Sequence, residues 1–264
     1  MSNLNILLFA KLIAFYFCNH TNIHWITCII SYTNYILYTY FYYLSFNNIY
    51  FAEAITPLNY SDPIHGTHKL ITYGFSTLHA LFISVCSTLY LFNIIDTYDI
   101  KQAYFISISY YLADTYYVID SVKKLTKNEY FLLCHHIVMI VIYYVIFIKI
   151  NNDNNLENYL LYYVNSGLIA EYSLLALNYS WYLIHTKQDT SNKMFISSIV
   201  TLTLYFLTRI VNFTRLLYNY CEDGGVSAIV LVMPLFLINY YWFFILMRKA
   251  IRIYNKTKVL ENTL

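Results

Sequence analysis

The chain has 264 residues, of which 59% are hydrophobic and only 11% are charged, and its mean hydropathy is +0.48. So few charged side chains cannot cover a soluble globule, which excludes the soluble classes of protein. The formal net charge of +2 is too small to indicate nucleic-acid binding. With five glycines and three prolines there is little material for turn-rich β architecture, so we predict an all-α integral membrane protein with one helical domain.

The chain begins with an apolar run at 4–18 that Lys11 interrupts and that is shorter than a comfortable membrane span. It lacks a basic leader and a clear small-x-small cleavage site, which disfavours a signal peptide. We interpret residues 1–22 as an N-terminal apolar segment that is interfacial or partly inserted in the membrane.

Seven longer apolar runs follow, and each approaches the about 20 residues that a helix needs to cross a hydrocarbon core of roughly 30 Å. They cover residues 23–45, 70–93, 103–122, 130–149, 158–184, 194–220 and 226–247. We therefore predict a polytopic bundle of about seven transmembrane helices. The expected division is a first transmembrane helix with its connecting loop at 23–65, a helix bundle at 66–250 and a basic tail at 251–264.

The basic residues of the loops indicate the orientation of this bundle. Placing the loop after the third run in the cytosol collects most of them on that side: Lys69, Lys123, Lys124, Lys127, Lys187, Lys193, Arg248, Lys249, Arg252, Lys256 and Lys258. The opposite loops hold only Lys11, Lys101 and Lys149. Because cytosolic loops carry an excess of Lys and Arg, we predict an N-terminus outside or in the lumen and a C-terminus in the cytosol.

Ionisable side chains inside the predicted spans are the candidates for function, because they are costly in lipid and tend to face a polar interior. His79, Asp114 and the adjacent pair His135 and His136 lie at similar depths from the cytosolic side. Glu171 and Arg209 lie nearer the midplane, and Gly167, Glu171, Leu174 and Asn178 follow one helix face. We predict that these residues line one polar cavity close to the cytosol.

The residue types in this cavity suit acyl transfer. Adjacent helical positions point about 100° apart, so one of His135 and His136 would address a substrate while a neighbour holds the other. A carboxylate such as Asp114 fixes the tautomer of an imidazole, which can then act as general base for a hydroxyl or amine. We therefore name His135, His136 and Asp114 as candidate catalytic residues.

Each of these residues also has a structural interpretation. The two histidines could form hydrogen bonds between helices, and Asp114 could pack as a neutral acid. Arg209 could hold a phosphate or carboxylate headgroup, or form a structural buried pair with Glu171. His79 is more simply interpreted as a buried histidine whose hydrogen bonds are satisfied.

Five segments together resemble a known family. They are Ser76–Leu81, Ser109–Asp114, Phe131–His136, Leu168–Ser173 with Asn178 and Trp181, and Tyr205–Ile210. Their order over about residues 66–250 resembles the TLC-domain proteins, named for the TRAM, longevity-assurance and neuronal ceroid lipofuscinosis homology region. The chain looks most similar to the small TLC domain-containing branch. The resemblance implies substrate-binding roles for His79, Glu171, Asn178, Trp181 and Arg209.

The ceramide synthase branch of that family uses a paired-histidine motif, matched by His135 and His136, to transfer a fatty acyl group from acyl-CoA to a sphingoid amine. That branch carries a His-Asp and a further acid after the pair. Here the fifth span has Gly167–Glu171 at the corresponding place, so those acids are missing. The usual Ser-Thr-Pro after the glutamate is replaced by Tyr172–Leu175, which removes a proline kink. Whether the chain is an enzyme therefore stays open.

Three functions remain as alternatives. The first is lipid homeostasis at the endoplasmic reticulum or a connected membrane, with lipid or acyl groups bound in the cavity and a ceramide-synthase-like acyltransferase activity. The second is a non-catalytic regulator of lipid composition or a trafficking receptor. The third is a transporter or proton relay, which would predict inverted repeats and broken helices that the sequence does not show.

The expected partners are membrane lipids, with acyl-CoA as co-substrate of an acyltransferase and a homo-oligomer as a further expectation. The five cysteines show no metal-ligand spacing, so we predict no metal and no bound cofactor. A disulfide between Cys18 and Cys221, which could share one side of the membrane, is left open.

Overall fold

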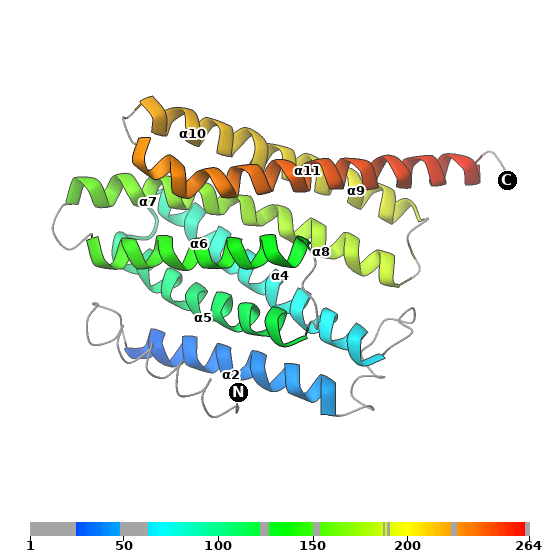
Figure 1. Cartoon of the computed structure of the whole chain (residues 1–264), viewed down its shortest axis with the longest axis horizontal. Coiled ribbons are helices and arrows are strands. Elements are labelled where there is room, and N and C mark those ends of the chain that lie inside the picture. The colour runs from blue at the N-terminus through cyan, green and yellow to red at the C-terminus, as the bar shows by residue number, and fades with distance from the viewer. Residues whose placement is uncertain are drawn as a thin grey trace. The chain divides into compact units, whose positions relative to one another are not determined.

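The computed structural model describes residues 25–47, 63–121, 127–149, 154–186, 188, 191–222 and 226–261, shown as coloured ribbons in Figure 1. These residues form seven helical segments and no strand. The segments are α2 (Trp25–Asn47), α4 (Pro63–Leu91), α5 (Thr97–Ser121), α6 (Lys127–Lys149), α7 (Asn154–Leu168) continued by η1 (Ile169–Glu171) and α8 (Tyr172–His185), α9 (Asn192–Tyr205) continued by η2 (Phe206–Val211) and α10 (Asn212–Glu222), and α11 (Val226–Glu261). The all-α prediction is confirmed, while the predicted N-terminal segment 1–22 lies outside the described residues.

Four stretches of the described helices are long and apolar enough to cross a membrane: Leu70–Leu91, Glu129–Phe147, Asn158–His185 and Asn192–Glu222. They overlap the second, fourth, fifth and sixth predicted spans. The other three predicted spans fall on α2, α5 and α11, whose 23, 25 and 36 residues are long enough for a crossing by length alone. The predicted orientation of the termini stays a prediction.

The last helix extends beyond the predicted seventh span. We expected the seventh span to end at residue 247 and a basic tail to follow, whereas α11 continues without a break to Glu261. Arg248, Lys249 and Arg252 therefore lie on a helix. Lys and Arg have good helix propensity, so the change from apolar to basic residues does not itself end a helix.

The chain forms two compact units. Unit 1 consists of Met1–Phe41 and Cys86–Val164, and unit 2 consists of Tyr42–Val85 and Asn165–Leu264. In unit 1, α5 lies beside α6, and the Ser31 hydroxyl of α2 donates to the Phe105 carbonyl of α5 at 3.1 Å. These three helices carry the first group of candidate residues.

A tight turn in unit 1 joins the end of α4 to α5. Asn93 has a φ of 56°, a left-handed conformation that asparagine adopts more readily than most residues. The Ile94 amide donates to the Leu89 carbonyl at 2.9 Å and so closes the end of α4. Asp96 then accepts from the Asp99 amide at 2.9 Å, which caps the first turn of α5.

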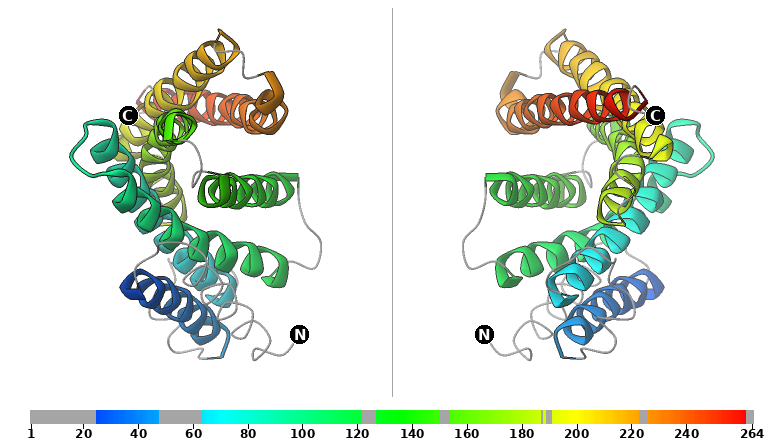
Figure 2. Two further views of the ribbon diagram at one scale, coloured as in Figure 1. Left: turned by 90° about the vertical axis from the view of Figure 1, so that its left-hand side faces the viewer. Right: turned by 90° about the vertical axis from the view of Figure 1, so that its right-hand side faces the viewer.

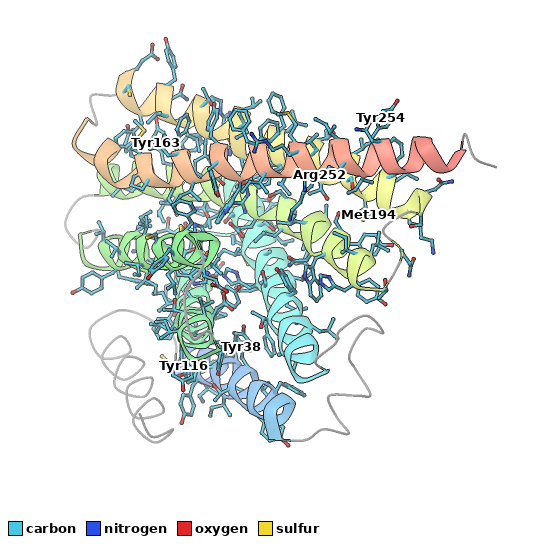
Figure 3. The ribbon with its side chains drawn as sticks, turned by 45° about the vertical axis from the view of Figure 1, so that its right-hand side comes forward. Tyr38, Tyr116, Tyr163, Met194, Arg252 and Tyr254 are labelled. Carbon is cyan, nitrogen blue, oxygen red and sulfur yellow. The ribbon has the colours of Figure 1, made fainter. Side chains whose placement is uncertain are left out.

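In unit 2, α8 packs against α9, and α11 runs along the α9–η2–α10 helix (Figure 2). Buried hydroxyls join α8 to α9, because Ser180 Oγ lies 2.7 Å from Ser197 Oγ and 3.0 Å from Thr201 Oγ1. Small polar residues of this kind allow close approach of helices in lipid. Tyr254 of α11 lies near the start of α9 (Figure 3), where its ring centroid is 6.1 Å from that of Phe195.

Helix α4 exposes large apolar side chains while it buries hydroxyls. Leu78 and Leu81 are 64% and 46% exposed, whereas the hydroxyls of Ser84 and Ser87 are fully buried. Apolar side chains can face outward at no cost when the surrounding solvent is lipid, while polar groups need partners inside the protein. The exposure of apolar residues on α4 thus agrees with a membrane span.

The cysteines correct one expectation. Cys221 is a free, exposed cysteine, so the suggested disulfide between Cys18 and Cys221 is wrong. Cys86 and the exposed Cys134 are also free.

Candidate functional site

A buried cluster in unit 1 joins α2, α5 and α6. His136 Nε2 of α6 lies 3.5 Å from Asp114 Oδ2 of α5, and both side chains are almost completely buried. The second carboxylate oxygen, Asp114 Oδ1, accepts a hydrogen bond of 2.7 Å from the Tyr38 hydroxyl of α2, a residue labelled in Figure 3. The acid predicted to orient a histidine is thus beside one, and α2 supplies a donor that the sequence reasoning missed.

The other ring nitrogen of His136 faces a hydroxyl. Thr115 Oγ1 lies 3.2 Å from His136 Nδ1. A carboxylate beside Nε2 favours the tautomer that carries its proton there, so Nδ1 is left as the acceptor toward Thr115. Asp114, His136 and Thr115 therefore place a carboxylate, an imidazole and a hydroxyl in series.

Tyrosine rings enclose this cluster. The ring centroid of His136 is 6.2 Å from that of Tyr110 and 5.1 Å from that of Tyr111, and both tyrosines are buried. The ring of Tyr38 also packs edge-on against Tyr117 at 4.6 Å. Aromatic walls exclude water and lower the local dielectric, which strengthens the interaction between the carboxylate and the imidazole.

The two adjacent histidines occupy different surroundings. His136 is buried beside Asp114, whereas His135 is half-buried and its ring centroid lies 6.0 Å from that of Tyr111. The two imidazole centroids are 5.8 Å apart. The sequence left open which histidine a neighbour holds, and the structure assigns that position to His136.

A second buried cluster lies in unit 2 around Arg209. Its Nη2 donates to Glu171 Oε1 at 3.3 Å, its Nε to Ser173 Oγ at 2.8 Å and its Nη1 to Asn239 Oδ1 at 3.0 Å. The guanidinium carbon also lies 5.1 Å from the centre of the Tyr205 ring. The ion pair that the sequence suggested is present, and protein groups surround the guanidinium.

Sequence reasoning missed three members of the Arg209 cluster. Asn239 is a polar residue within the last apolar run and was a visible signal, because an amide at that depth needs a partner. Tyr205, which donates to Asn239 at 3.2 Å, stands at the start of the Tyr205–Ile210 segment but had no predicted role. Ser173 stands in the Leu168–Ser173 segment but had no predicted role.

Both members of the ion pair lie in irregular helix. Glu171 ends the 3₁₀ segment η1, and Arg209 lies in the π-helical segment η2. The 3₁₀ segment η1 forms without a proline. The fifth span is therefore irregular even though the Ser-Thr-Pro sequence is missing. A change of helical period rotates the following side chains, and Glu171 and Asn178, predicted on one face, contact different helices.

Asn178 and Trp181 of α8 contact the middle of α4. Asn178 Nδ2 donates to Thr77 Oγ1 at 2.8 Å, and the Trp181 ring stacks on Tyr73 with centroids 4.3 Å apart. His185 stacks on the same Trp181, also at 4.3 Å. His79 is buried on α4, two residues after Thr77. The substrate-binding roles of these residues stay predictions.

The candidate residues are divided between the two units. Unit 1 holds Asp114, His135 and His136, and unit 2 holds His79, Glu171, Asn178, Trp181 and Arg209. The prediction that all of them line one cavity stays a prediction. Within the described residues, no group of three or more His, Cys, Asp or Glu side chains could hold a metal ion.

The long apolar helices and the buried polar clusters between them define an integral, multi-pass membrane protein of helical type. A family model described as the TLC domain matches residues 65–248. The chain therefore belongs to the TLC-domain family, a lipid-related family of membrane proteins, as the sequence motifs predicted. Comparisons with curated proteins and with solved structures found no match.

Proposed function

We propose that this chain acts in membrane lipid homeostasis as an acyltransferase of the endoplasmic reticulum, with His136 as general base. The observation that supports the proposal is the buried series Asp114, His136 and Thr115. Acyl-CoA would supply the acyl group, and a lipid that carries a hydroxyl or an amine would accept it.

The chemistry follows from the different surroundings of the two ring nitrogens of His136. Nδ1 takes the proton from an attacking hydroxyl or amine, while Asp114 holds the proton on Nε2 and stabilises the imidazolium that forms. General base assistance of this kind contributes about 10²- to 10⁴-fold to a rate. Burial of the pair strengthens the stabilisation, since water does not screen the two charges.

The surface of α6 suits a substrate that arrives from the lipid. Ile137, next to His136 in sequence, is 55% exposed, and Val141 one turn later is 40% exposed. Apolar side chains exposed in this way offer a lipid chain a route along the helix that carries the base. An acyl acceptor dissolved in the membrane would not have to cross a polar surface.

The test is an acyl-transfer assay with the purified full chain in lipid nanodiscs. Acyl-CoA with a labelled acyl chain is offered with sphingoid bases, lysophospholipids and diacylglycerol in separate reactions. We expect product with one acceptor class, and a loss of about 10²- to 10⁴-fold in His136→Gln and in Asp114→Asn. Thr203→Val, a change at an exposed position of α9, serves as the control with wild-type turnover. Undiminished product in His136→Gln would disprove the proposal.

A non-catalytic regulator of lipid composition is the second candidate. Protein groups accept hydrogen bonds from Arg209 and Asn178, which is what helices held together by polar contacts require. This candidate predicts that the lipid profile of cells changes on expression of the chain and changes equally on expression of His136→Gln. A profile that returns to baseline with His136→Gln favours catalysis instead.

A further inference from the structure

We propose that Thr115 is the nucleophile of this site and carries the acyl group as an ester between the two half-reactions. The inference rests on the proposed acyl transfer and specifies its covalent step. It assigns a catalytic residue that none of the sequence motifs singled out.

The first support is the position of the hydroxyl. Thr115 Oγ1 lies 3.2 Å from His136 Nδ1, within reach for proton transfer, and Asp114 lies at the opposite nitrogen. A nucleophile bonded to a base, with the base oriented by a third group, is the arrangement that activates a hydroxyl. Asp114 and Thr115 are neighbours on α5, so one helix positions both ends of the series.

The second support is the contrast with other threonines on the helices. Thr39, Thr77, Thr208 and Thr214 each donate to the backbone carbonyl four residues earlier on the same helix. A threonine hydroxyl inside a helix commonly makes this local hydrogen bond. Thr115 also lies inside a helix, but its hydroxyl contacts His136 on the neighbouring helix. The Thr115 hydroxyl is thus directed at the imidazole, as a hydroxyl activated by a base has to be.

The third support is accessibility. Asp114 and His136 are buried, whereas Thr115 is half-buried. Thr115 is thus the least buried of the three residues, as the residue that receives the acyl group has to be. The carboxylate and imidazole behind it stay shielded from water, which limits loss of an ester by hydrolysis.

In the first half-reaction, Thr115 Oγ1 attacks the carbonyl carbon of the acyl thioester while its proton moves to His136 Nδ1. The tetrahedral intermediate collapses, the carbon–sulfur bond breaks, and the thiolate takes the proton from the imidazolium. The products are a free thiol and a Thr115 ester. In the second half-reaction, the acceptor hydroxyl or amine attacks the ester, His136 takes its proton, and Thr115 leaves as an alkoxide that recovers that proton.

The experiment incubates the full chain with a long-chain acyl-CoA and no acceptor, followed by intact mass measurement and fragmentation. We expect a mass gain of one acyl group in place of one hydrogen, located on Thr115. The adduct should be absent from Thr115→Val and His136→Gln, and present in Thr115→Ser and in the control Thr203→Val. Because Cys134 is exposed and next to His135, Cys134→Ser serves as the background, so that a thioester on cysteine is not mistaken for the product.

Turnover with an acceptor separates the possible failures. We expect Thr115→Val to lose about 10²-fold or more, the lower end of what one acid–base group contributes, and Thr115→Ser to keep most of the rate. Full turnover in folded Thr115→Val, or an acyl group found on a histidine, would rule out Thr115 as the nucleophile. It would not rule out acyl transfer that depends on His136. If wild-type protein shows neither turnover nor adduct, the proposed function falls as well.

Discussion

The two oxygens of Asp114 have partners of different kinds. Oδ1 accepts from the neutral Tyr38 hydroxyl at 2.7 Å, and Oδ2 faces His136 Nε2 at 3.5 Å. The hydrogen bond from Tyr38, together with one from Tyr110, orients the carboxylate, and the carboxylate in turn orients the imidazole. Tyr38 is therefore a positioning residue, two contacts away from the reacting proton.

Replacing Tyr38 by Phe should lower kcat by roughly tenfold and leave KM nearly unchanged. The ring and its packing remain, while one hydrogen bond to a charged group, about 1.5–3 kcal/mol at full value, is lost. Rates at saturating and limiting acyl-CoA measure the two constants separately. Tyr40→Phe on the exposed side of the same helix is the matched control. An equal loss in both variants would show that the effect is not specific to Asp114.

Arg209 should matter for stability more than any other single side chain of unit 2. Arg209→Met leaves Glu171 as a buried charge without its partner, which typically costs about 3–5 kcal/mol. The double variant Glu171→Gln with Arg209→Met removes both charges and should recover part of that loss. The free energy of unfolding is measured in detergent for the wild type, the two single variants and the double variant, by recording circular dichroism as denaturant is added.

The matched control for this cycle is Arg215→Met, since Arg215 is exposed and contacts Asn212 on its own helix. We expect its free energy of unfolding to stay close to the wild-type value. A double variant as unstable as the sum of the two single variants would contradict a direct pair between Glu171 and Arg209.

At the scale of elements, the helix α9–η2–α10 changes its period where Arg209 lies. The Asn212 amide donates to the Leu207 carbonyl, a π-type bond that spans five residues. A π segment accommodates one extra residue in a helix. The extra residue allows the contacting side chains of both α9 and α10 to point toward their partners. On the α9 side Ser197 and Thr201 contact Ser180, and on the α10 side Asn212 donates to the Ser166 carbonyl.

Deletion of Leu207 should therefore be tolerated better than deletion of Ile199. Leu207 is exposed and lies in the π segment, so its loss lets the segment revert to α-helix with both flanks in register. Ile199 is also exposed but lies in regular α9, and its loss rotates one flank by about 100° against the other. Thermal unfolding in detergent compares the two, with Leu207→Ala as the control for the lost side chain. Equal destabilisation by both deletions would argue against a register role for η2.

At the scale of the whole molecule, the chain is an integral membrane protein of the TLC-domain family. Apolar side chains are exposed on α4 and α6, and many polar side chains of the protein lie in buried clusters. The distribution of basic residues over the loops predicts the orientation of the chain in the membrane. Arg248, Lys249 and Arg252 lie in the C-terminal half of α11, after its apolar part, where the rule for positive loops predicts the cytosol.

A tag at the C-terminus should be cleaved by protease added to sealed microsomes, and a tag at the N-terminus should be protected. The excess of Lys and Arg in the loops on the C-terminal side is the physical reason. Opening the vesicles with detergent should make both tags accessible, which controls for tags that are simply resistant. Protection of the C-terminal tag in sealed vesicles would reverse the predicted orientation.

The sequence by itself determined where the helices lie and what class of protein they form. In lipid each backbone amide and carbonyl must find its partner within the segment, so an apolar run of sufficient length is almost bound to be a helix. This is why each predicted span overlaps one observed helical segment. Composition and the order of five short motifs were enough for the family. The end of helix α11 was not predicted, because hydropathy marks where a helix leaves the membrane and not where it ends.

Only the tertiary structure decided which polar groups meet. His136 rather than His135 faces Asp114, Thr115 reaches the second nitrogen, and Asn239 completes the Arg209 cluster. These choices depend on the rotation of each helix about its own axis, and a turn of about 100° would exchange neighbouring residues at a contact. Apolar residues cover most sides of these helices, so the hydrophobic pattern does not specify that rotation. Packing against the neighbouring helices does, and it decided which histidine could act as the base.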